Sequence, residues 1–210
     1  MYVSNIKLYK TNLRAKYKQL RADLNPKFKK HMDIEIAKRI SFLREYQKQE
    51  ILLTYVSKSI EVDTFGIIAA ARKANKIVAV PKCITEKKEM KFYIINSLKD
   101  LEPGAFGVWE PNATKCEELP PDAGGLCIVP GFSFDLHGYR LGYGQGYYDR
   151  FLTNFTGVTV GVCYHSCIKN ELPHGYYDRP VDILVTNRYI RTIGNSYSRA
   201  KKERNARHGR

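Results

Sequence analysis

The sequence predicts one α/β domain in which a largely parallel sheet is flanked by helices and preceded by a helical N-terminal segment. Short aliphatic runs alternate along the chain with stretches of helical periodicity, which is typical of a parallel sheet. The composition, 43% hydrophobic and 27% charged, is that of a soluble globular protein. The 210 residues suit a single domain, and no linker precedes about Asn195. We therefore predict one domain over residues 1–195, with 196–210 as a basic, disordered tail.

Two amphipathic helices are predicted at the N-terminus. Apolar residues recur at spacings of three and four from Ile6 to Leu24, and the pattern returns from Phe28 to Tyr46. Pro26 lies between the two stretches and separates them. These helices form the predicted N-terminal layer.

Strands and helices then alternate, which predicts the parallel sheet. Asp63 is the expected N-cap of a helix over 64–74, and Asn75 is its expected stop. Pro81 is expected to end a strand, and 96–125 is a connection rich in glycine and proline. A further helix is expected to begin near Gly146. The predicted strands are 51–56, 76–81, 90–95, 126–130, 159–164 and 181–186.

Targeting and cysteine patterns favour a cytoplasmic protein, which we expect to be a monomer. No run approaches the roughly 18 apolar residues of a membrane span, and the first thirty residues have no signal-peptide pattern. The 5 cysteines are odd in number and form no CxxC pair. Reduced, buried thiols are the prediction, with a metal or redox site as the alternative.

The formal charge of +14 is unevenly distributed. Lysine and arginine outnumber the single aspartate in residues 1–30, and they outnumber the single glutamate in 199–210. Such a charge attracts anions, including nucleotides, polyanionic small molecules and nucleic acid. A nucleic-acid-binding protein that uses the N-terminal helix and the tail is therefore an alternative, although no RNA-binding aromatic signature or helix-turn-helix pattern supports it.

The five letters GYYDR occur twice, at 146–150 and 175–179. An internal repeat would carry its flanks with it, because the repeating unit is a whole supersecondary element. The first copy follows a strand and a run of glycines and opens a helix, whereas the second runs directly into Pro180 and a strand. The second copy is therefore predicted to be a surface turn rather than an equivalent site.

The glycine-rich stretch 140–146 predicts an anion-binding loop. Glycine permits positive φ and close approach of backbone N–H groups to a ligand. The helix expected to begin behind the loop adds free N–H groups and the positive end of its dipole. The loop also follows the strand 126–130, and ligands in open α/β sheets bind beyond strand carboxyl ends. The spacing matches neither the P-loop nor GxGxxG, so a flexible turn is the alternative.

Two aspartates are candidate magnesium ligands. Asp149 lies in the first turn of the predicted helix, where a carboxylate also complements the dipole. Beside phosphate it would suit Mg²⁺, which takes one or two carboxylates together with phosphate oxygens and water. Asp182, at the start of the last predicted strand, would supply the second carboxylate.

A long motif surrounds the glycine loop. From Val129 to Asp149 a strand ending V-P-G is followed by F-D-x-x-G-x-R-L-G-x-G-x-G-Y-Y-D. On this motif the chain resembles the 5-formyltetrahydrofolate cyclo-ligase family, also called 5,10-methenyltetrahydrofolate synthetase. Further matches are a K-x-x-L-R motif from Lys10, a segment over 57–64, the G-V-W-E-P stretch from Gly107, and Pro180 to Thr186. The resemblance runs in order from about residue 7 to 187, and we expect a Rossmann-like three-layer fold.

The resemblance implies ATP- and Mg²⁺-dependent closure of 5-formyltetrahydrofolate (folinate) to 5,10-methenyltetrahydrofolate, with release of ADP and phosphate. A nucleotide-binding relative with a different acceptor is the further alternative. Arg140 and Tyr147 would be catalytic, and Asp149 and Asp182 would hold magnesium. Trp109 would line the folate pocket, or serve packing instead. The implied folate contacts are Val56, Glu61, Trp109 and Tyr147, and the implied ATP contacts are Lys10, Arg14, Arg140, Leu141, Gly142, Tyr143, Gly144, Gln145, Gly146, Tyr147 and Tyr148.

Two loop positions depart from the family pattern. Tyr143 stands where many members have arginine, and Gln145 stands where glycine or a basic residue is common. The tyrosine removes a possible phosphate charge. Nucleotide binding is therefore expected to depend more on Arg140, Lys10 and Arg14.

Overall fold

The computed structural model of the protein describes residues 5–194, so the predicted tail at 196–210 lies outside the described residues. Within the described residues the main sheet has seven strands and is largely parallel, as predicted. Its two edge strands are antiparallel to their neighbours. In sheet order the strands are β12 (Ile190–Thr192), β11 (Ile183–Val185), β9 (Val158–Val162), β6 (Leu126–Pro130), β1 (Ile51–Leu53), β2 (Ile77–Ile84) and β3 (Glu89–Ile94).

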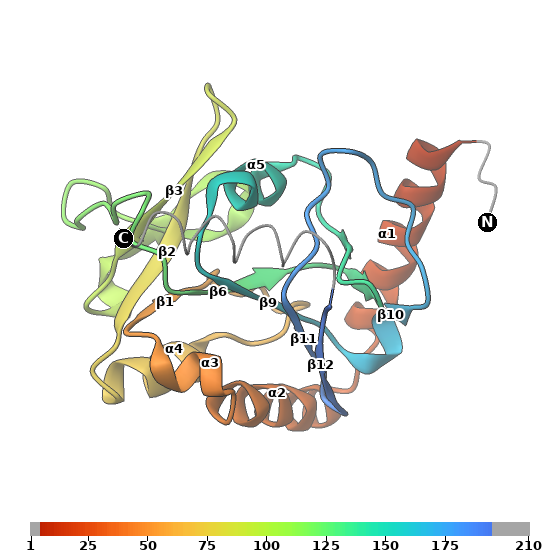
Figure 1. The fold of residues 1–210 in the computed structure, drawn as a ribbon, viewed down its shortest axis with the longest axis horizontal. Helices are drawn as coiled ribbons and strands as arrows, with labels where there is room; N and C mark the ends of the chain where they lie inside the picture. Colours follow the sequence, from red (N-terminus) through yellow and green to blue (C-terminus); the bar gives the residue numbers. More distant parts are fainter. Residues whose placement is uncertain (1–4, 195–210) are drawn as a thin grey trace.

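Helices cover both faces of this sheet, which gives the three layers (Figure 1). On one face lie α2 (Pro26–Ser41), α3 (Arg44–Lys48) and α4 (Phe65–Lys73). On the other face lies α5 (Tyr147–Asn154), and α1 (Ile6–Ala22) packs at the end of the molecule beside β10. The connection from β1 to β2 crosses one face and the connection from β6 to β9 crosses the other, because right-handed crossovers leave this adjacent pair in opposite directions. The pair β1 and β6 is therefore the switch point of the sheet.

The two N-terminal helices begin at side-chain caps. Asn5 accepts a hydrogen bond from the backbone N–H of Leu8 at 2.9 Å, and Asn25 accepts one from Lys27 at 2.9 Å. Pro26 then occupies the first turn of α2, where its missing N–H costs nothing. Both helices bury one stripe at helical spacing, which docks them on the domain. These stripes are Leu13, Tyr17 and Arg21 in α1, and Met32, Ile36 and Ile40 in α2.

Three predicted boundaries were wrong. The helix expected over Phe28–Tyr46 divides at Leu43, where extended backbone turns a buried side chain into the core. The strand expected over 51–56 ends at Leu53. Pro81 does not stop β2, which continues to Ile84. Beyond Ala79 the strand pairs with β3 alone, so the ring of Pro81 interrupts no ladder.

Short elements occupy stretches where no regular structure was predicted. The connection 96–125 contains a hairpin of β4 (Leu101–Pro103) and β5 (Trp109–Pro111), with 3₁₀ turns at Leu98–Asp100 and Ala105–Gly107. The chain after β6 forms a second small sheet, and a 3₁₀ turn at His165–Cys167 precedes its last strand. The strands of that small sheet are β7 (Ser133–Asp135), β8 (Arg140–Leu141) and β10 (Ile168–Lys169).

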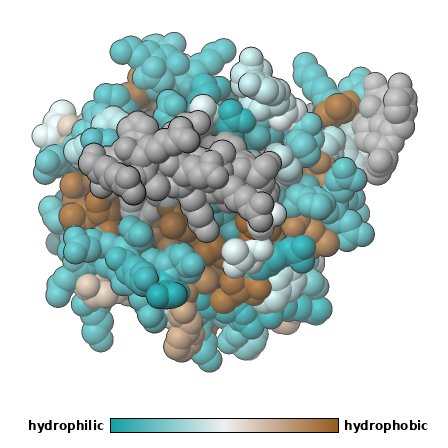
Figure 2. Space-filling model, in the orientation of Figure 1, coloured by the Kyte–Doolittle hydropathy of each residue, from teal (hydrophilic) through white to brown (hydrophobic). Residues whose placement is uncertain are grey.

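The core lies between the sheet and its helices, and β6 is buried along its whole length. The described surface in Figure 2 is mostly hydrophilic, with hydrophobic residues showing toward the middle of that face. The five cysteines all lie within the described residues and form no disulfide, and Cys127, Cys163 and Cys167 are buried. Among the described helices, none has the length and apolar character needed to cross a membrane.

Candidate functional site

A cavity of about 550 Å³ opens beyond the carboxyl ends of β1 and β6. Tyr55 and Val56 follow β1 into its wall, and Pro130 ends β6 there. Ligands of open α/β sheets bind at such a switch point, and this volume suits a ligand the size of a nucleotide or a larger heterocycle. Further walls come from α1, from β2 and β3, from the β4–β5 hairpin, from the loop between β8 and α5 with the first turn of α5, and from the chain before β11.

The glycine loop lies between β8 and α5. Gly144 has φ +98° and Gly146, the N-cap of α5, has φ +70°, a region that side chains with a Cβ rarely adopt. The Nε of Arg14 donates to the carbonyl of Gly142 at 2.8 Å and fixes the loop to α1. The glycine-rich loop and the first turn of α5 therefore both line the cavity, and the helix begins behind the loop as the sequence predicted.

Cationic side chains gather at this end of the cavity. Arg140 is 5% exposed, and its Nη1 pairs with Asp149 at 2.9 Å. Its buried Nε has no hydrogen-bond partner within residues 5–194. An unpaired buried donor is costly, so this nitrogen suits an acceptor supplied by a ligand. Lys10 and Arg14, one helical turn apart on α1, line the same wall.

Asp178 is a second carboxylate at the cationic end. It pairs with Lys10 at 2.9 Å and accepts a hydrogen bond from the N–H of Gly175 at 3.0 Å. Burial alone would raise the pKa of Asp178, but the bonds from Lys10 and Gly175 outweigh it and hold that pKa below its usual value. The residue is therefore ionised at neutral pH and completes a cluster of alternating charges with Lys10, Arg140 and Asp149.

The opposite wall is largely apolar and carries the buried carboxylate of Glu61. Glu61 is 5% exposed, and its Oε2 accepts a hydrogen bond from the N–H of Lys58 at 2.7 Å. Its Oε1 accepts one from the hydroxyl of Tyr143. Val56 and Trp109 line the same wall, and the indole of Trp109 is exposed rather than packed into the core. Such a wall accommodates a flat apolar body with a few N–H donors.

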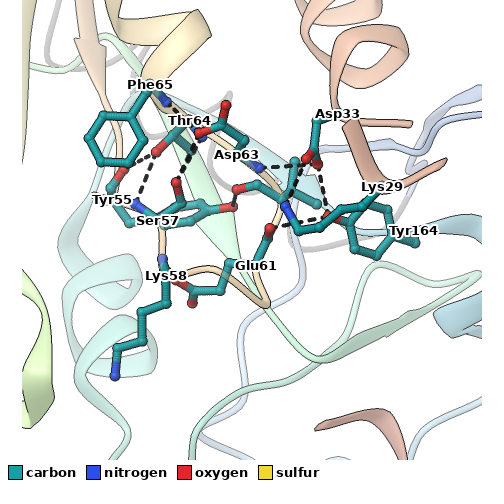
Figure 3. A network of polar contacts seen from close by, with 11 residues as sticks. Lys29, Asp33, Tyr55, Ser57, Lys58, Glu61, Asp63, Thr64, Phe65 and Tyr164 are labelled. Atoms are coloured by element: carbon teal, nitrogen blue, oxygen red, sulfur yellow. Dashed lines mark hydrogen bonds and ion pairs between the residues drawn. The ribbon is translucent and has the colours of Figure 1, made fainter. Parts of the chain in front are cut away.

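A buried network fixes the segment that carries Glu61 (Figure 3). The hydroxyl of Tyr164 lies 2.8 Å from Asp33 Oδ1 and 3.1 Å from the carbonyl of Glu61. Asp33 also accepts from the N–H of Asp63 at 3.2 Å and pairs with Lys29 at 2.8 Å. Helix α2 and the chain after β9 thus hold the backbone of Glu61 from behind.

Shorter contacts complete this segment. The Thr64 hydroxyl donates to the carbonyl of Tyr55 at 2.7 Å and accepts from the N–H of Ser57 at 3.2 Å. The predicted N-cap, Asp63, accepts from the N–H of Phe65 at 3.0 Å, although Thr64 occupies the cap position of α4. The loop from β1 to α4 is therefore closed on itself.

Two tyrosines of the first GYYDR copy lie between the two ends. The ring of Tyr147 faces Phe106 edge-on, with ring centroids 6.0 Å apart. Burial raises the pKa of Tyr148 well above its ordinary value, so its hydroxyl stays protonated. That hydroxyl is buried and has no hydrogen-bond partner in the described part of the chain. Its place on the cavity wall makes it a candidate contact for a ligand.

The structure brings nearly all predicted site residues to one cavity, and Asp182 is the exception. Its carboxylate accepts hydrogen bonds from the N–H and the hydroxyl of Thr159, at 2.9 Å and 2.7 Å. The parallel register of β9 and β11 sets this pair at the amino ends of the strands, away from the site. The prediction that Asp149 and Asp182 lie together is wrong. Those that line the cavity are Lys10, Arg14, Val56, Glu61, Trp109, Arg140, Leu141, Gly142, Tyr143, Gly144, Gln145, Gly146, Tyr147, Tyr148 and Asp149.

The sequence reading also missed residues that line the cavity. Asp178 belongs to the second GYYDR copy, whose tyrosines 176 and 177 are indeed exposed. Its position four residues before Asp182 gave no signal, because only the fold brings it to Lys10. Glu110 is buried and accepts from the N–H of Cys83 at 3.1 Å. Burial is the main reason that the pKa of the Cys83 thiol is raised to about 11, and the neighbouring charge of Glu110 adds to the effect. The thiol is therefore no nucleophile at neutral pH.

Known proteins resemble the chain over this whole region. The family model described as the 5-formyltetrahydrofolate cyclo-ligase family matches residues 6–187. A probable 5-formyltetrahydrofolate cyclo-ligase of Schizosaccharomyces pombe is 30% identical over 85% of this chain and 98% of its own. A 5-formyltetrahydrofolate cyclo-ligase of Haemophilus influenzae is 28% identical over 82% of this chain and 95% of its own.

A solved structure agrees with the sequence comparisons. The 5,10-methenyltetrahydrofolate synthetase of Aquifex aeolicus superposes with a TM-score of 0.79 at 34% identity, covering 89% of this chain and 94% of that one. The family model spans every predicted site residue, from Lys10 to Asp182. The chain therefore belongs to the 5-formyltetrahydrofolate cyclo-ligase family.

Proposed function

We propose that the protein is a cyclo-ligase that uses ATP and Mg²⁺ to convert 5-formyltetrahydrofolate to 5,10-methenyltetrahydrofolate. Membership of the family supports the activity. The main structural support for the proposal is that the cavity has two chemically different ends. One end holds glycine backbone and cations, and the other holds apolar side chains and the carboxylate of Glu61.

The cationic end would take the triphosphate. Backbone N–H groups of the loop and of the first turn of α5 point toward an anion at a helix N-terminus. Arg140 has a free Nε in a buried position, which suits a charge-assisted hydrogen bond to a phosphate oxygen. Lys10 and Arg14 add charge from the facing helix. This set neutralises phosphate without a P-loop.

The same end suits magnesium. Asp149 and Asp178 both line the cavity and both offer the hard oxygen ligands that Mg²⁺ prefers. No group of three or more histidine, cysteine, aspartate or glutamate side chains gathers at a metal-like site in residues 5–194. We assign the ion to these two carboxylates because both line the cationic end, with phosphate oxygens and water as its other ligands. Bound there, Mg²⁺ would neutralise charge on the transferring phosphoryl group.

The apolar end would take the folate. Glu61 presents an acceptor to the N–H donors of the pterin, since a carboxylate only accepts. Tyr147 and Trp109 offer aromatic faces to a flat heterocycle. Tyr147 precedes Tyr148, whose ring centroid lies 5.7 Å from the Arg140 guanidinium, so a folate stacked on Tyr147 would have its formyl group near the phosphates.

The chemistry requires little more than this arrangement. The formyl oxygen takes the γ-phosphoryl group and ADP leaves, which turns a poor leaving group into phosphate. N10 of the same molecule then attacks the formyl carbon, loses its proton, and phosphate departs with the former formyl oxygen. Phosphoryl transfer depends mainly on positioning and charge neutralisation. A protein nucleophile is unnecessary, in agreement with the protonated Cys83 thiol.

A direct assay tests the activity. Purified protein is mixed with folinate, ATP and MgCl₂, and the near-ultraviolet absorbance of the methenyl product is followed. We expect the absorbance to rise only when all three are present. A rise without ATP, or none with the complete mixture, would contradict the proposal. ATP binding without folinate turnover would instead favour a relative with another acceptor.

A further inference from the structure

Tyr143 connects the two ends of the cavity. It belongs to the glycine loop, yet its hydroxyl donates to Oε1 of Glu61 on the opposite wall. In the sequence, the tyrosine at this position replaces a common arginine and removes a possible phosphate charge. In the structure the tyrosine contributes a contact of its own.

The ring of Tyr143 is 42% exposed and packs with one side against the buried ring of Phe132. Its centroid lies 4.6 Å from that of Phe132, and the guanidinium of Arg21 lies 5.6 Å from the Phe132 centroid on the next layer. Arg21 is buried and donates to the carbonyl of Gly131 at 2.6 Å. The platform beneath Tyr143 is therefore fixed, and the hydroxyl reaches Glu61 from a defined direction.

Glu61 keeps capacity for a ligand while it accepts this bond. Each carboxylate oxygen has two lone-pair positions. Lys58 N–H occupies one on Oε2, and the Tyr143 hydroxyl occupies one on Oε1. The remaining two can accept N–H donors of a heterocycle. The contact from Tyr143 thus sets the plane of the carboxylate without filling it.

The loop itself gains order through this contact. Gly144 and Gly146 have positive φ, and their lack of side chains leaves the loop much conformational freedom when it is unrestrained. An anion bound to the loop N–H groups would reduce that freedom, as would a ligand that holds Glu61 in place. Whichever ligand binds first lowers the ordering cost for the second.

We propose that Tyr143 is a positioning residue through which binding at the phosphate end and binding at the folate end strengthen each other. The inference rests on the proposed function, because it assigns the two ligands to the two ends. Burial of the hydroxyl is the main cause that raises the pKa of Tyr143, and the neighbouring charge of Glu61 adds to it. The hydroxyl therefore remains a donor at neutral pH. By linkage the enhancement must be equal in both directions.

The test measures folinate affinity with and without a non-hydrolysable ATP analogue and MgCl₂. Trp109 is the only tryptophan and lines the cavity, so its fluorescence reports folinate binding. We expect the analogue to tighten folinate binding to the wild type by about 5-fold or more, the usual scale of coupling. Tyr143→Phe keeps the ring on Phe132 and removes only the hydroxyl. In this variant the ratio of folinate affinities with and without the analogue should be close to one.

Matched variants separate positioning from stability. Tyr177→Phe removes a hydroxyl from a tyrosine that is 76% exposed and does not line the cavity, and it should keep the full enhancement. Glu61→Asp retracts the carboxylate from Tyr143 and should lose the enhancement too. In that background, Tyr143→Phe should cause no further loss, because the two changes remove the same contact.

The outcomes distinguish this inference from the proposed function. Full enhancement in Tyr143→Phe, or a wild type that binds both ligands without enhancement, overturns the coupling and leaves the proposed function intact. A wild type that binds no folinate overturns both. Loss of enhancement in Tyr143→Phe, with Tyr177→Phe unchanged, supports the coupling.

Discussion

The two principal cations of the cavity each form an ion pair with a side-chain carboxylate. Arg140 pairs with Asp149 and Lys10 pairs with Asp178, each at 2.9 Å. A triphosphate entering this cluster would compete for the cations, and the released carboxylates would be free to bind magnesium. The four residues therefore act as one unit, and single substitutions should change nucleotide and metal dependence together.

Asp149→Asn tests the metal role. The amide keeps the shape of the side chain but loses the charge that Mg²⁺ favours. We expect turnover to fall at least about tenfold, which is only about 1.4 kcal/mol of lost transition-state stabilisation, and to require more magnesium. Turnover measured across a magnesium titration checks this. Wild-type turnover at every magnesium concentration would remove Asp149 from the metal site.

Asp182→Asn is the matched control. Asp182 accepts two hydrogen bonds from Thr159 and does not line the cavity. The variant should keep the magnesium dependence of the wild type and lose about 1–3 kcal/mol of unfolding free energy, the scale for hydrogen bonds to a charged group. A shifted magnesium dependence without loss of stability would restore the original assignment of Asp182.

The ion pair of Asp178 should stabilise the folded protein in a pH-dependent way. Its pKa is lowered in the folded protein, so its ion pair stabilises the fold above the unfolded pKa, about 4. That contribution is lost as the pH falls through the lowered value. Urea unfolding of the wild type and Asp178→Asn should therefore differ at neutral pH and converge in acid. The pair is partly exposed, so the difference is at most about 1 kcal/mol. A difference independent of pH would exclude the ion pair as its cause.

Among the elements, the segment between β1 and α4 depends on support from behind. Tyr164 is fully buried and links Asp33 of α2 to the carbonyl of Glu61. Burial is the main cause that raises the pKa of Tyr164, and the charge of Asp33 adds to it, so the hydroxyl stays a donor. The position of the Glu61 carboxylate therefore depends on a helix that does not touch the cavity.

Tyr164→Phe tests this support. The buried acceptors lose a donor, so unfolding free energy should fall by about 1–2 kcal/mol. Because the Glu61 segment loosens, the KM for folinate should rise several-fold while kcat changes little. Tyr46→Phe, at another buried tyrosine that does not line the cavity, serves as control. An unchanged folinate KM in Tyr164→Phe would show that the network serves stability alone.

Local patterns predicted most elements, and the failures have physical causes. The apolar residues of α1 recur at helical spacing and β6 is one continuous aliphatic run, so both elements could be predicted from the sequence. Pro81 was misread because its effect depends on whether a neighbouring strand continues beside it, which is a tertiary property. The hairpin of β4 and β5 has strands of three residues, too short for alternation to appear.

At the scale of the molecule, strand order creates the site. Because β1 and β6 are neighbours whose crossovers diverge, their carboxyl ends leave an opening that helices do not fill. The motif around 140–149 located the phosphate end of this opening from sequence. Asp178 reaches it only through the packing of the chain before β11 on α1, so no local pattern revealed it. The monomeric state and the cytoplasmic location stay predictions from the sequence.

In the proposed reaction, one cavity transfers the γ-phosphoryl group of ATP to the formyl oxygen of folinate. Folinate whose formyl oxygen carries a heavy isotope tests this transfer directly, with mass analysis of the released phosphate. We expect the label to appear in inorganic phosphate, one atom for each methenyl product formed. Label released into water, or product formed with unlabelled phosphate, would contradict it.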